Sequence, residues 1–129
     1  MKPAASISLD LDNLWSYLKT QGVPGWESYP SYLDLVVPRI LETLDRCDQR
    51  ITFFIVGQDA TMESNRAALK SIADAGHEIA NHSFMHEPWL HLYSRYQLHQ
   101  EIRDAENAIA AVTGKTARGF RGPVFSTSP

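Results

Sequence analysis

Four side chains of types that bind metals occur as two pairs in distant parts of the chain. Asp10 and Asp12 form an Asp-x-Asp pair near the N-terminus, and His82 and His86 form a His-x-x-x-His pair in the second half. Two neutral imidazoles and one carboxylate bind zinc and leave open positions for water and substrate. Zinc lowers the pKa of a bound water to near neutrality, and a second carboxylate can accept its proton. The combination predicts a metal-dependent hydrolase, with zinc as the expected ion and cobalt or nickel as alternatives.

Each of these signals is weak when taken alone. Asp-x-Asp pairs also occur in solvated turns, histidines at this spacing are frequent on surfaces, and Arg121 by itself fits an ordinary surface ion pair. The combination gains weight because each residue lies at the end of a segment with the pattern of a strand. We do not expect His77, His91 or His99 to be ligands, since His91 lies in an aromatic loop and His99 on a charged helix.

The strands and helices that would position these residues alternate along the chain. Apolar runs predict strands at residues 6–11, 51–56, 77–81 and 116–120. Helical spacing of apolar residues predicts helices at residues 32–44, 61–74 and 97–112. In the last helix, Ile102, Ile109 and Val112 are expected to face the core and Glu101 the solvent. This alternation predicts an α/β fold with parallel strands, whose functional residues gather at the carboxyl ends of the strands.

A long aromatic segment at residues 15–30 interrupts the alternation. Its Gly and Pro residues predict a loop, and a loop of this length is commonly functional. Trp15, Trp26 and Tyr29, together with Trp89, are candidates to line a sugar groove, although aromatic residues serve equally often in packing.

Charge and composition argue against several classes of function. The 12 basic and 15 acidic residues make a mildly acidic chain without a Lys/Arg run, which argues against nucleic acid as a partner. No apolar stretch approaches the ~20 residues that span a bilayer, and the N-terminus has no apolar signal-peptide core. We therefore expect a cytoplasmic protein without a membrane partner. The single cysteine, Cys47, excludes an internal disulfide.

Four segments together resemble the polysaccharide deacetylases, the NodB-homology enzymes of carbohydrate esterase family 4. The matching segments are residues 8–13, 51–57, 76–86 and 119–123. The resemblance implies that residues 1–129 form the N-terminal portion of a distorted, TIM-like (β/α) barrel. It also implies a carbohydrate substrate and hydrolysis of a carbon–nitrogen bond other than a peptide bond, by which an acetyl group is removed from an N-acetylated sugar or polysaccharide.

The resemblance also implies roles for individual residues. The family's metal ligands correspond to Asp12, His82 and His86. Asp10 corresponds to the catalytic base, Arg121 to the arginine that orients this base, and Val124 to the residue whose backbone N–H stabilises the oxyanion. In the family the two aspartates are usually adjacent, whereas Leu11 separates them here. The roles of Asp10 and Asp12 could therefore be exchanged.

The family's later motifs, which supply a histidine general acid and its carboxylate partner, have no counterpart in residues 1–129. We therefore expect a C-terminally incomplete deacetylase domain that turns over slowly by itself and tends to form homo-oligomers. Two other functions stay open at this point. One is an amidohydrolase for a non-sugar amide, allantoinase-like or acting on a cyclic imide, and the other is an inactive metal- or glycan-binding fragment.

Overall fold

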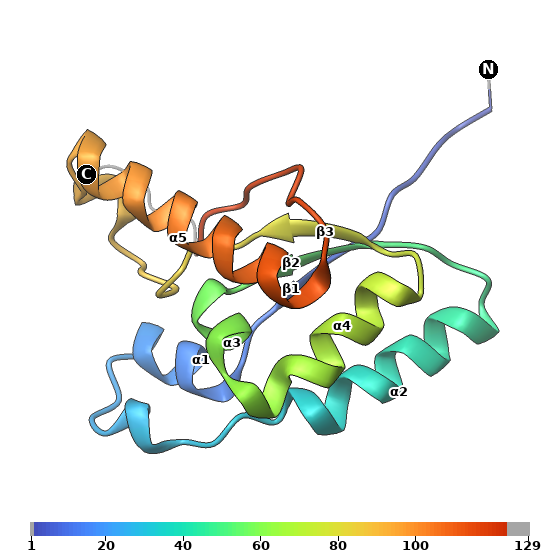
Figure 1. Cartoon of the computed structure of the whole chain (residues 1–129), viewed down its shortest axis with the longest axis horizontal. Coiled ribbons are helices and arrows are strands. Elements are labelled where there is room, and N and C mark those ends of the chain that lie inside the picture. Colours follow the sequence, from blue (N-terminus) through green and yellow to red (C-terminus); the bar gives the residue numbers. More distant parts are fainter. Residues whose placement is uncertain (1, 124–129) are drawn as a thin grey trace.

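In residues 2–123, which this computed structural model describes, three parallel strands form a sheet with helices packed on one face (Figure 1). The strands are β1 (Ser8–Leu11), β2 (Thr52–Ile55) and β3 (Glu78–Asn81), in the spatial order β1-β2-β3. The α-helices of this part are α1 (Leu14–Thr20), α2 (Leu33–Arg46), α3 (Gly57–Thr61), α4 (Arg66–Asp74) and α5 (Arg95–Thr113). Its short 3-10 helices are η1 (Trp26–Ser28), η2 (Glu63–Asn65) and η3 (Leu90–Leu92). The α/β class and the parallel strands are confirmed, and an open sheet of this kind is consistent with part of a barrel.

The register of the sheet aligns the carboxyl ends of its strands. Leu11 of β1, Ile55 of β2 and Asn81 of β3 are neighbours across the sheet. Asp12 and His82 follow directly after Leu11 and Asn81, so both residues leave the sheet at the same edge. The backbone N–H of His82 donates to the carbonyl oxygen of Ile55 at 2.9 Å, which extends this alignment beyond β3.

The core lies between the sheet and helices α2, α4 and α5. Side chains of β2 alternate, so that Phe53 and Ile55 are buried among the helices while Phe54 lies on the opposite face. The helices contribute Leu33, Val37, Leu69, Ile72 and Ile109, which are all fully buried. Burial of each such side chain stabilises the fold by about 1.5–3 kcal/mol. This packing fixes the sheet and with it the edge at which the polar residues emerge.

Two helical segments differ from the sequence prediction. Residues 14–20 form α1 instead of a loop, because the side-chain oxygen of Asn13 accepts a hydrogen bond from the N–H of Leu14 at 2.9 Å and caps the helix. The helix predicted at residues 61–74 is divided, since Met62 has an extended backbone (φ −81°, ψ 122°) between α3 and η2.

The strand predicted at residues 116–120 is reduced to a single parallel bridge. Phe120 pairs with Asn81, and the N–H of Asn81 donates to the carbonyl of Gly119 at 2.8 Å. The N–H of Arg121 donates back to the carbonyl of Asn81 at 2.9 Å. The segment therefore runs alongside β3 in the predicted direction and brings Arg121 to the carboxyl end of the sheet.

Glu101 is a fourth departure from the sequence prediction. It was expected to face solvent, but it is buried on the face of α5 that also carries Ala105, Ile109 and Val112. Ile102, expected to face the core, is only partly buried. Ile109 and Val112 are buried as predicted, so the difference is confined to the first half of α5.

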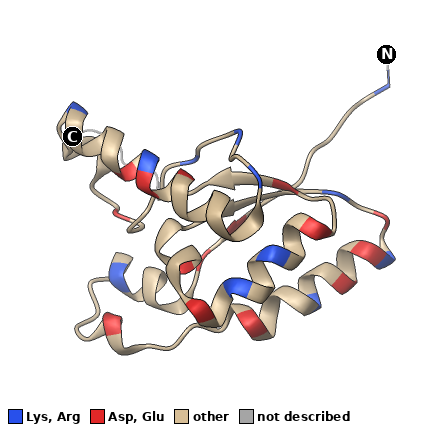
Figure 2. Cartoon of the chain, in the orientation of Figure 1, with Lys and Arg blue, Asp and Glu red and all other residues tan. Residues whose placement is uncertain are grey.

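Both basic and acidic residues lie along α2 and α4 (Figure 2). Arg46 pairs with Glu42 and Lys70 with Asp74, in both cases one helical turn apart. Exposed pairs of this kind contribute only about 0.3–0.5 kcal/mol. Among the helices of residues 2–123, none combines the length and apolar character that a membrane crossing requires.

We predict that Gly57→Ala destabilises the protein. A methyl group at this position would lie 2.6 Å from Cδ2 of Phe84 and 2.7 Å from the Cα of Ala105, so α3 and α5 would have to separate. Such overpacking typically costs about 1–3 kcal/mol of unfolding free energy, measurable by urea denaturation. The control is Gly119→Ala, whose added methyl group would be 3.8 Å from its nearest neighbour. Equal stability of the two variants would contradict the close packing of α3 on α5.

Candidate metal centre

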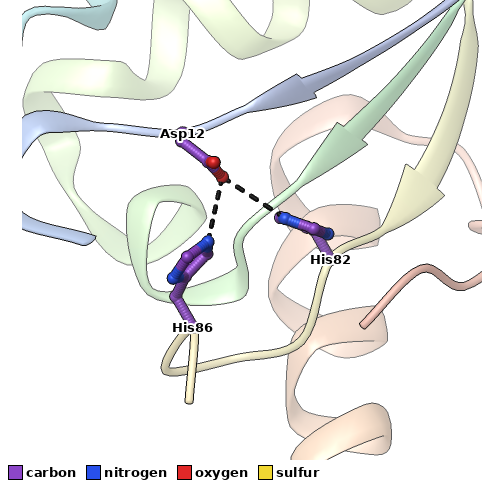
Figure 3. Close-up of side chains that lie close together, drawn as sticks. All are labelled: Asp12, His82 and His86. Carbon is purple, nitrogen blue, oxygen red and sulfur yellow. Dashed lines mark ion pairs between the residues drawn. The ribbon is translucent and has the colours of Figure 1, made fainter. Parts of the chain in front are cut away.

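Side chains from two segments that are distant in the sequence converge at the carboxyl edge of the sheet (Figure 3). Oδ1 of Asp12 lies 3.3 Å from Nε2 of His82 and 3.1 Å from Nε2 of His86. One potential ligand atom of each residue lies within 4.8 Å of the others. Asp12 follows β1, His82 follows β3, and His86 ends the short connection after His82. The predicted juxtaposition of these three residues is present in the structure.

Hydrogen bonds to the distal nitrogens orient both imidazoles. Nδ1 of His82 lies 2.7 Å from the carbonyl oxygen of Arg121, which can only accept, so this nitrogen carries the proton. Nδ1 of His86 lies 3.3 Å from the hydroxyl of Thr20, whose own proton is donated to the carbonyl of Ser16. Both histidines therefore hold a proton on Nδ1 and turn the lone pair of Nε2 toward Asp12, as metal-binding histidines do.

The donor set fits a divalent metal. Oδ1 of Asp12 and Nε2 of His86 are buried and make no hydrogen bond with the described residues. Two ligands at zinc distances of about 2.0–2.1 Å and a tetrahedral angle are about 3.3–3.4 Å apart, close to the 3.1 and 3.3 Å observed. About a third of the Asp12 side chain, 35%, is exposed, so the centre is open to solvent on one side.

The charge state of Asp12 suits this role. Burial raises the pKa of its carboxyl group, but His82 and His86 more than compensate when an Nε2 proton faces the carboxylate in place of a metal ion. The resulting pKa lies well below the usual range, and the carboxylate is ionised at neutral pH. Its backbone is held as well, since the hydroxyl of Tyr32 donates to the carbonyl oxygen of Asp12 at 2.7 Å.

Asp10 lies beside these three residues and is held by Arg121. Nη1 of Arg121 donates to Oδ1 of Asp10 at 2.8 Å, Nη2 donates to the hydroxyl of Ser8 at 2.8 Å, and the guanidinium lies 4.0 Å from the ring centre of Phe54. The other oxygen of Asp10 is 4.0 Å from Nε2 of His82. The structure thus brings Asp10 and Arg121 to the same site, whereas Val124 lies outside the described residues.

A buried network of polar side chains lies next to Asp12 in the sequence and begins at Asn13. The side-chain amide of Asn13 donates to Ser31 at 2.7 Å and to Oδ1 of Asp59 at 3.0 Å, and the indole N–H of Trp15 donates to the same oxygen at 2.7 Å. Asp59 is fully buried, and burial raises the pKa of its carboxyl group to about 6 despite these hydrogen bonds. This network joins the start of α1 to α3 and to the residues before α2.

Of the four aromatic residues proposed to line a sugar groove, three lie together. Trp15 and Trp26 pack with ring centres 5.6 Å apart, and with Tyr29 they line a cavity of about 190 Å³. The cavity is completed by Glu27, Gln58, Met62 and Met85. One lining residue, Met85, directly precedes the candidate ligand His86 in the sequence. Trp89 is 59% exposed and is not among the residues that line it.

Sequence reasoning missed several supporting residues of the centre. Thr20 was assigned to a loop, although Asn13, a residue type that favours helix N-caps, offered a signal for α1. Ser8, Asp59 and Glu101 had no such signal for a role at the site, because their partners are distant in sequence. As expected, His77, His91 and His99 are not part of the cluster. His77 is instead buried, with its Nδ1 accepting the N–H of Ile51 at 3.2 Å.

Comparison with known proteins gives a consistent result. The family model described as polysaccharide deacetylase matches residues 25–128, a segment that starts after Asp10 and Asp12. A peptidoglycan deacetylase-like protein from Gibberella zeae is 38% identical over 92 residues, 69% of this chain and 26% of that protein.

Two solved structures of family 4 proteins are similar in fold to this chain. A family 4 acetyl xylan esterase from Clostridium thermocellum, in complex with a cobalt ion, has a TM-score of 0.70 and 27% identity. The match covers 96% of this chain and 50% of the esterase. A family 4 pseudoenzyme from Bacillus anthracis has a TM-score of 0.64 and 31% identity, covering 73% of this chain and 32% of its own. The chain thus spans between about a quarter and a half of the length of these relatives.

We predict that the chain binds about one zinc or cobalt ion and that the double variant His82→Ala, His86→Ala does not. Removing two of the three candidate ligands leaves one carboxylate, which cannot hold the ion alone. Isothermal titration calorimetry measures the stoichiometry. A matched control is His91→Ala, His99→Ala, which removes two exposed histidines outside the cluster. Equal binding by the wild type and the first double variant would rule out the site.

A second prediction concerns the pH dependence of stability. Because the folded-state pKa of Asp59 is about 6 and its ordinary value is 3.8, the folded protein binds this proton more tightly than the unfolded chain. The contribution of Asp59 to the unfolding free energy therefore falls as pH rises from about 4 to about 6, by about 3 kcal/mol at most.

Asp59→Asn keeps an oxygen acceptor and removes the charge. The variant should gain stability relative to the wild type across this pH range, measured by urea denaturation of the chelator-treated protein. Asp104→Asn, at an exposed position of α5, is the control and should show no such trend. A difference between Asp59→Asn and wild type that is constant from pH 4 to pH 7 would contradict the raised pKa.

Proposed function

The chain belongs to the polysaccharide deacetylase family, and on this basis we propose that it is a metal-dependent hydrolase that removes acetyl groups from an N-acetylated sugar polymer. The observation that carries the proposal is the convergence of Asp12, His82 and His86, with the Asp10–Arg121 pair directly beside them. This set combines metal ligands with a separate carboxylate that is free to handle a proton. The reaction is hydrolysis of a carbon–nitrogen bond other than a peptide bond.

Asp12, His82 and His86 would hold the metal, with zinc as the proposed ion. When bound, a divalent metal supplies a Lewis acid that lowers the pKa of water and polarises an acyl carbonyl. The solved relative with a cobalt ion supports a divalent metal in this family. The nitrogen and oxygen donors suit zinc, and cobalt and nickel accept the same ligands.

In the proposed mechanism, Asp10 takes the proton from the attacking water. Arg121 occupies one oxygen of Asp10 at 2.8 Å, and the other oxygen lies 4.0 Å from the metal-facing nitrogen of His82. Asp12 approaches both imidazoles more closely, at 3.3 and 3.1 Å. The distances therefore support Asp10 as the base and Asp12 as the ligand, rather than the exchanged assignment.

A carbohydrate substrate is supported by two observations. One relative is named a peptidoglycan deacetylase-like protein and another an acetyl xylan esterase. The cavity beside Met85 offers aromatic faces from Trp26 and Tyr29 together with polar groups of Gln58 and Glu27, a combination suited to the alternating apolar faces and hydroxyl edges of a sugar ring. A small cyclic amide would leave most of this surface unused.

An inactive metal-binding fragment is the second candidate. It is favoured by one relative of similar fold, which is described as a pseudoenzyme. The two candidates are separated by measuring acetate release from N-acetylglucosamine oligomers and from peptidoglycan. The assay uses the zinc-loaded chain and, in parallel, any longer protein that contains it. Metal binding without acetate release by either protein would favour the inactive fragment.

The roles of the two aspartates are tested by Asp10→Asn and Asp12→Asn in whichever protein is active. If Asp10 is the base, its variant should bind metal normally and lose about 100- to 10,000-fold in kcat. Asp12→Asn should weaken metal binding and activity together. The outcome that reverses the assignment is loss of metal from Asp10→Asn with retention by Asp12→Asn. Asp34→Asn, at an exposed position of α2, is the control for loss of a carboxylate.

A further inference from the structure

The connection from His82 to His86 has a backbone that would not persist without support. Ser83 and His86 both have positive φ values, 68° and 49°, although neither is glycine. A residue with a side chain in this left-handed region is typically less stable by about 1–2 kcal/mol. Two such residues within one connection between candidate ligands require strong external bonds.

Every backbone N–H from residue 82 to residue 86 has an acceptor. The bonds that arise locally join Ser83 to the side chain of Asn81 at 2.8 Å and His86 to the hydroxyl of Ser83 at 3.1 Å. Of the remaining three, the N–H of His82 donates to the carbonyl of Ile55. The N–H groups of Phe84 and Met85 both donate to Oε1 of Glu101, at 3.0 and 2.7 Å. Glu101 is the one acceptor here that belongs to a helix of the described chain.

The carbonyl groups of the same connection are held from the other side. The N–H groups of Gly57 and Gln58, at the start of α3, donate to the carbonyl oxygens of Ser83 and Phe84, each at 2.9 Å. Because Gly57 has no side chain, α3 approaches both Phe84 and α5 closely. The connection is therefore clamped between donors of α3 and the carboxylate of Glu101.

We propose that Glu101 is a positioning residue for the metal centre, holding the connection in the strained conformation that directs His86 toward Asp12. Its side chain is buried, and among the described residues it has no cationic partner within ion-pair distance. A buried carboxylate without a cation is a poor choice for stability alone. Two charge-assisted hydrogen bonds to one strained segment explain its presence. The inference rests on the proposed metal-binding function.

The effect of Glu101 is expected on metal affinity. Without the carboxylate, two buried N–H groups lose their acceptor, and the connection relaxes toward unstrained backbone angles. His86 then no longer meets Asp12 and His82 without reorganisation. Loss of a residue that orients metal ligands typically lowers metal affinity by about 10- to 100-fold.

The test measures Co²⁺ affinity and the visible Co²⁺ spectrum for wild type, Glu101→Asp, Glu101→Gln and Glu101→Ala. Gln keeps the reach of the side chain and an oxygen acceptor but loses the charge, whereas Asp keeps the charge but is one methylene too short. A positioning role predicts that Glu101→Gln binds more tightly than Glu101→Asp, with Glu101→Ala about 10- to 100-fold weaker than wild type. Glu106→Ala, an exposed glutamate on the same helix, is the control and should leave affinity and spectrum unchanged.

Unfolding of each metal-free variant is measured in parallel, so that a loss of folded protein is not mistaken for a loss of affinity. If Glu101→Ala does not fold, the relative Co²⁺ affinities of Glu101→Asp and Glu101→Gln decide. Equal affinity of the folded Asp, Gln and wild-type proteins, or tighter binding by Asp than by Gln, would overturn the role of Glu101 and leave the metal centre standing. Lack of Co²⁺ binding by the wild type would instead overturn the metal centre itself.

Discussion

The structure depends on one constraint, which is that one ligand atom from the residue after β1 must meet two from the connection after β3 in a small volume. Oδ1 of Asp12 and Nε2 of His86 are buried, and the described residues offer them no hydrogen bond. Leaving such atoms buried and unpaired costs several kcal/mol in a chain without metal. A bound cation would remove this penalty, so metal binding and local stability must be linked.

The arrangement is held by bonds made away from the ligand atoms. A carbonyl of the segment beside β3 orients His82, the hydroxyl of Thr20 on α1 orients His86, and Tyr32 holds the backbone of Asp12. Each of these partners comes from a different element, and each element is anchored in the core or in the buried network around Asp59. The positions of α1, of the Arg121 segment and of the start of α2 are therefore conditions for the site.

The strands and the candidate ligands could be predicted from the sequence because both signals are local. Ile51 to Val56 is a continuous apolar run, and Asp12 and His82 directly follow strands whose register aligns them. Glu101 shows where local reasoning fails. Its charge favours solvent, yet it lies four residues before Ala105 on the buried face of α5, and its partners are backbone groups of another segment. Only a tertiary contact explains its burial, and no periodicity in the sequence specifies that contact.

Arg121 joins the two chemical parts of the site. Its guanidinium binds Asp10 and Ser8, while its backbone carbonyl accepts the proton of His82. The Arg121–Asp10 pair is about two-fifths exposed, and a pair with this exposure adds little to stability. Its value is therefore geometric, because the fork of the guanidinium aligns one carboxylate oxygen and leaves the other free. Since the segment that carries Arg121 forms a single bridge with β3, docking of that segment sets the orientation of the base and of one metal ligand at the same time.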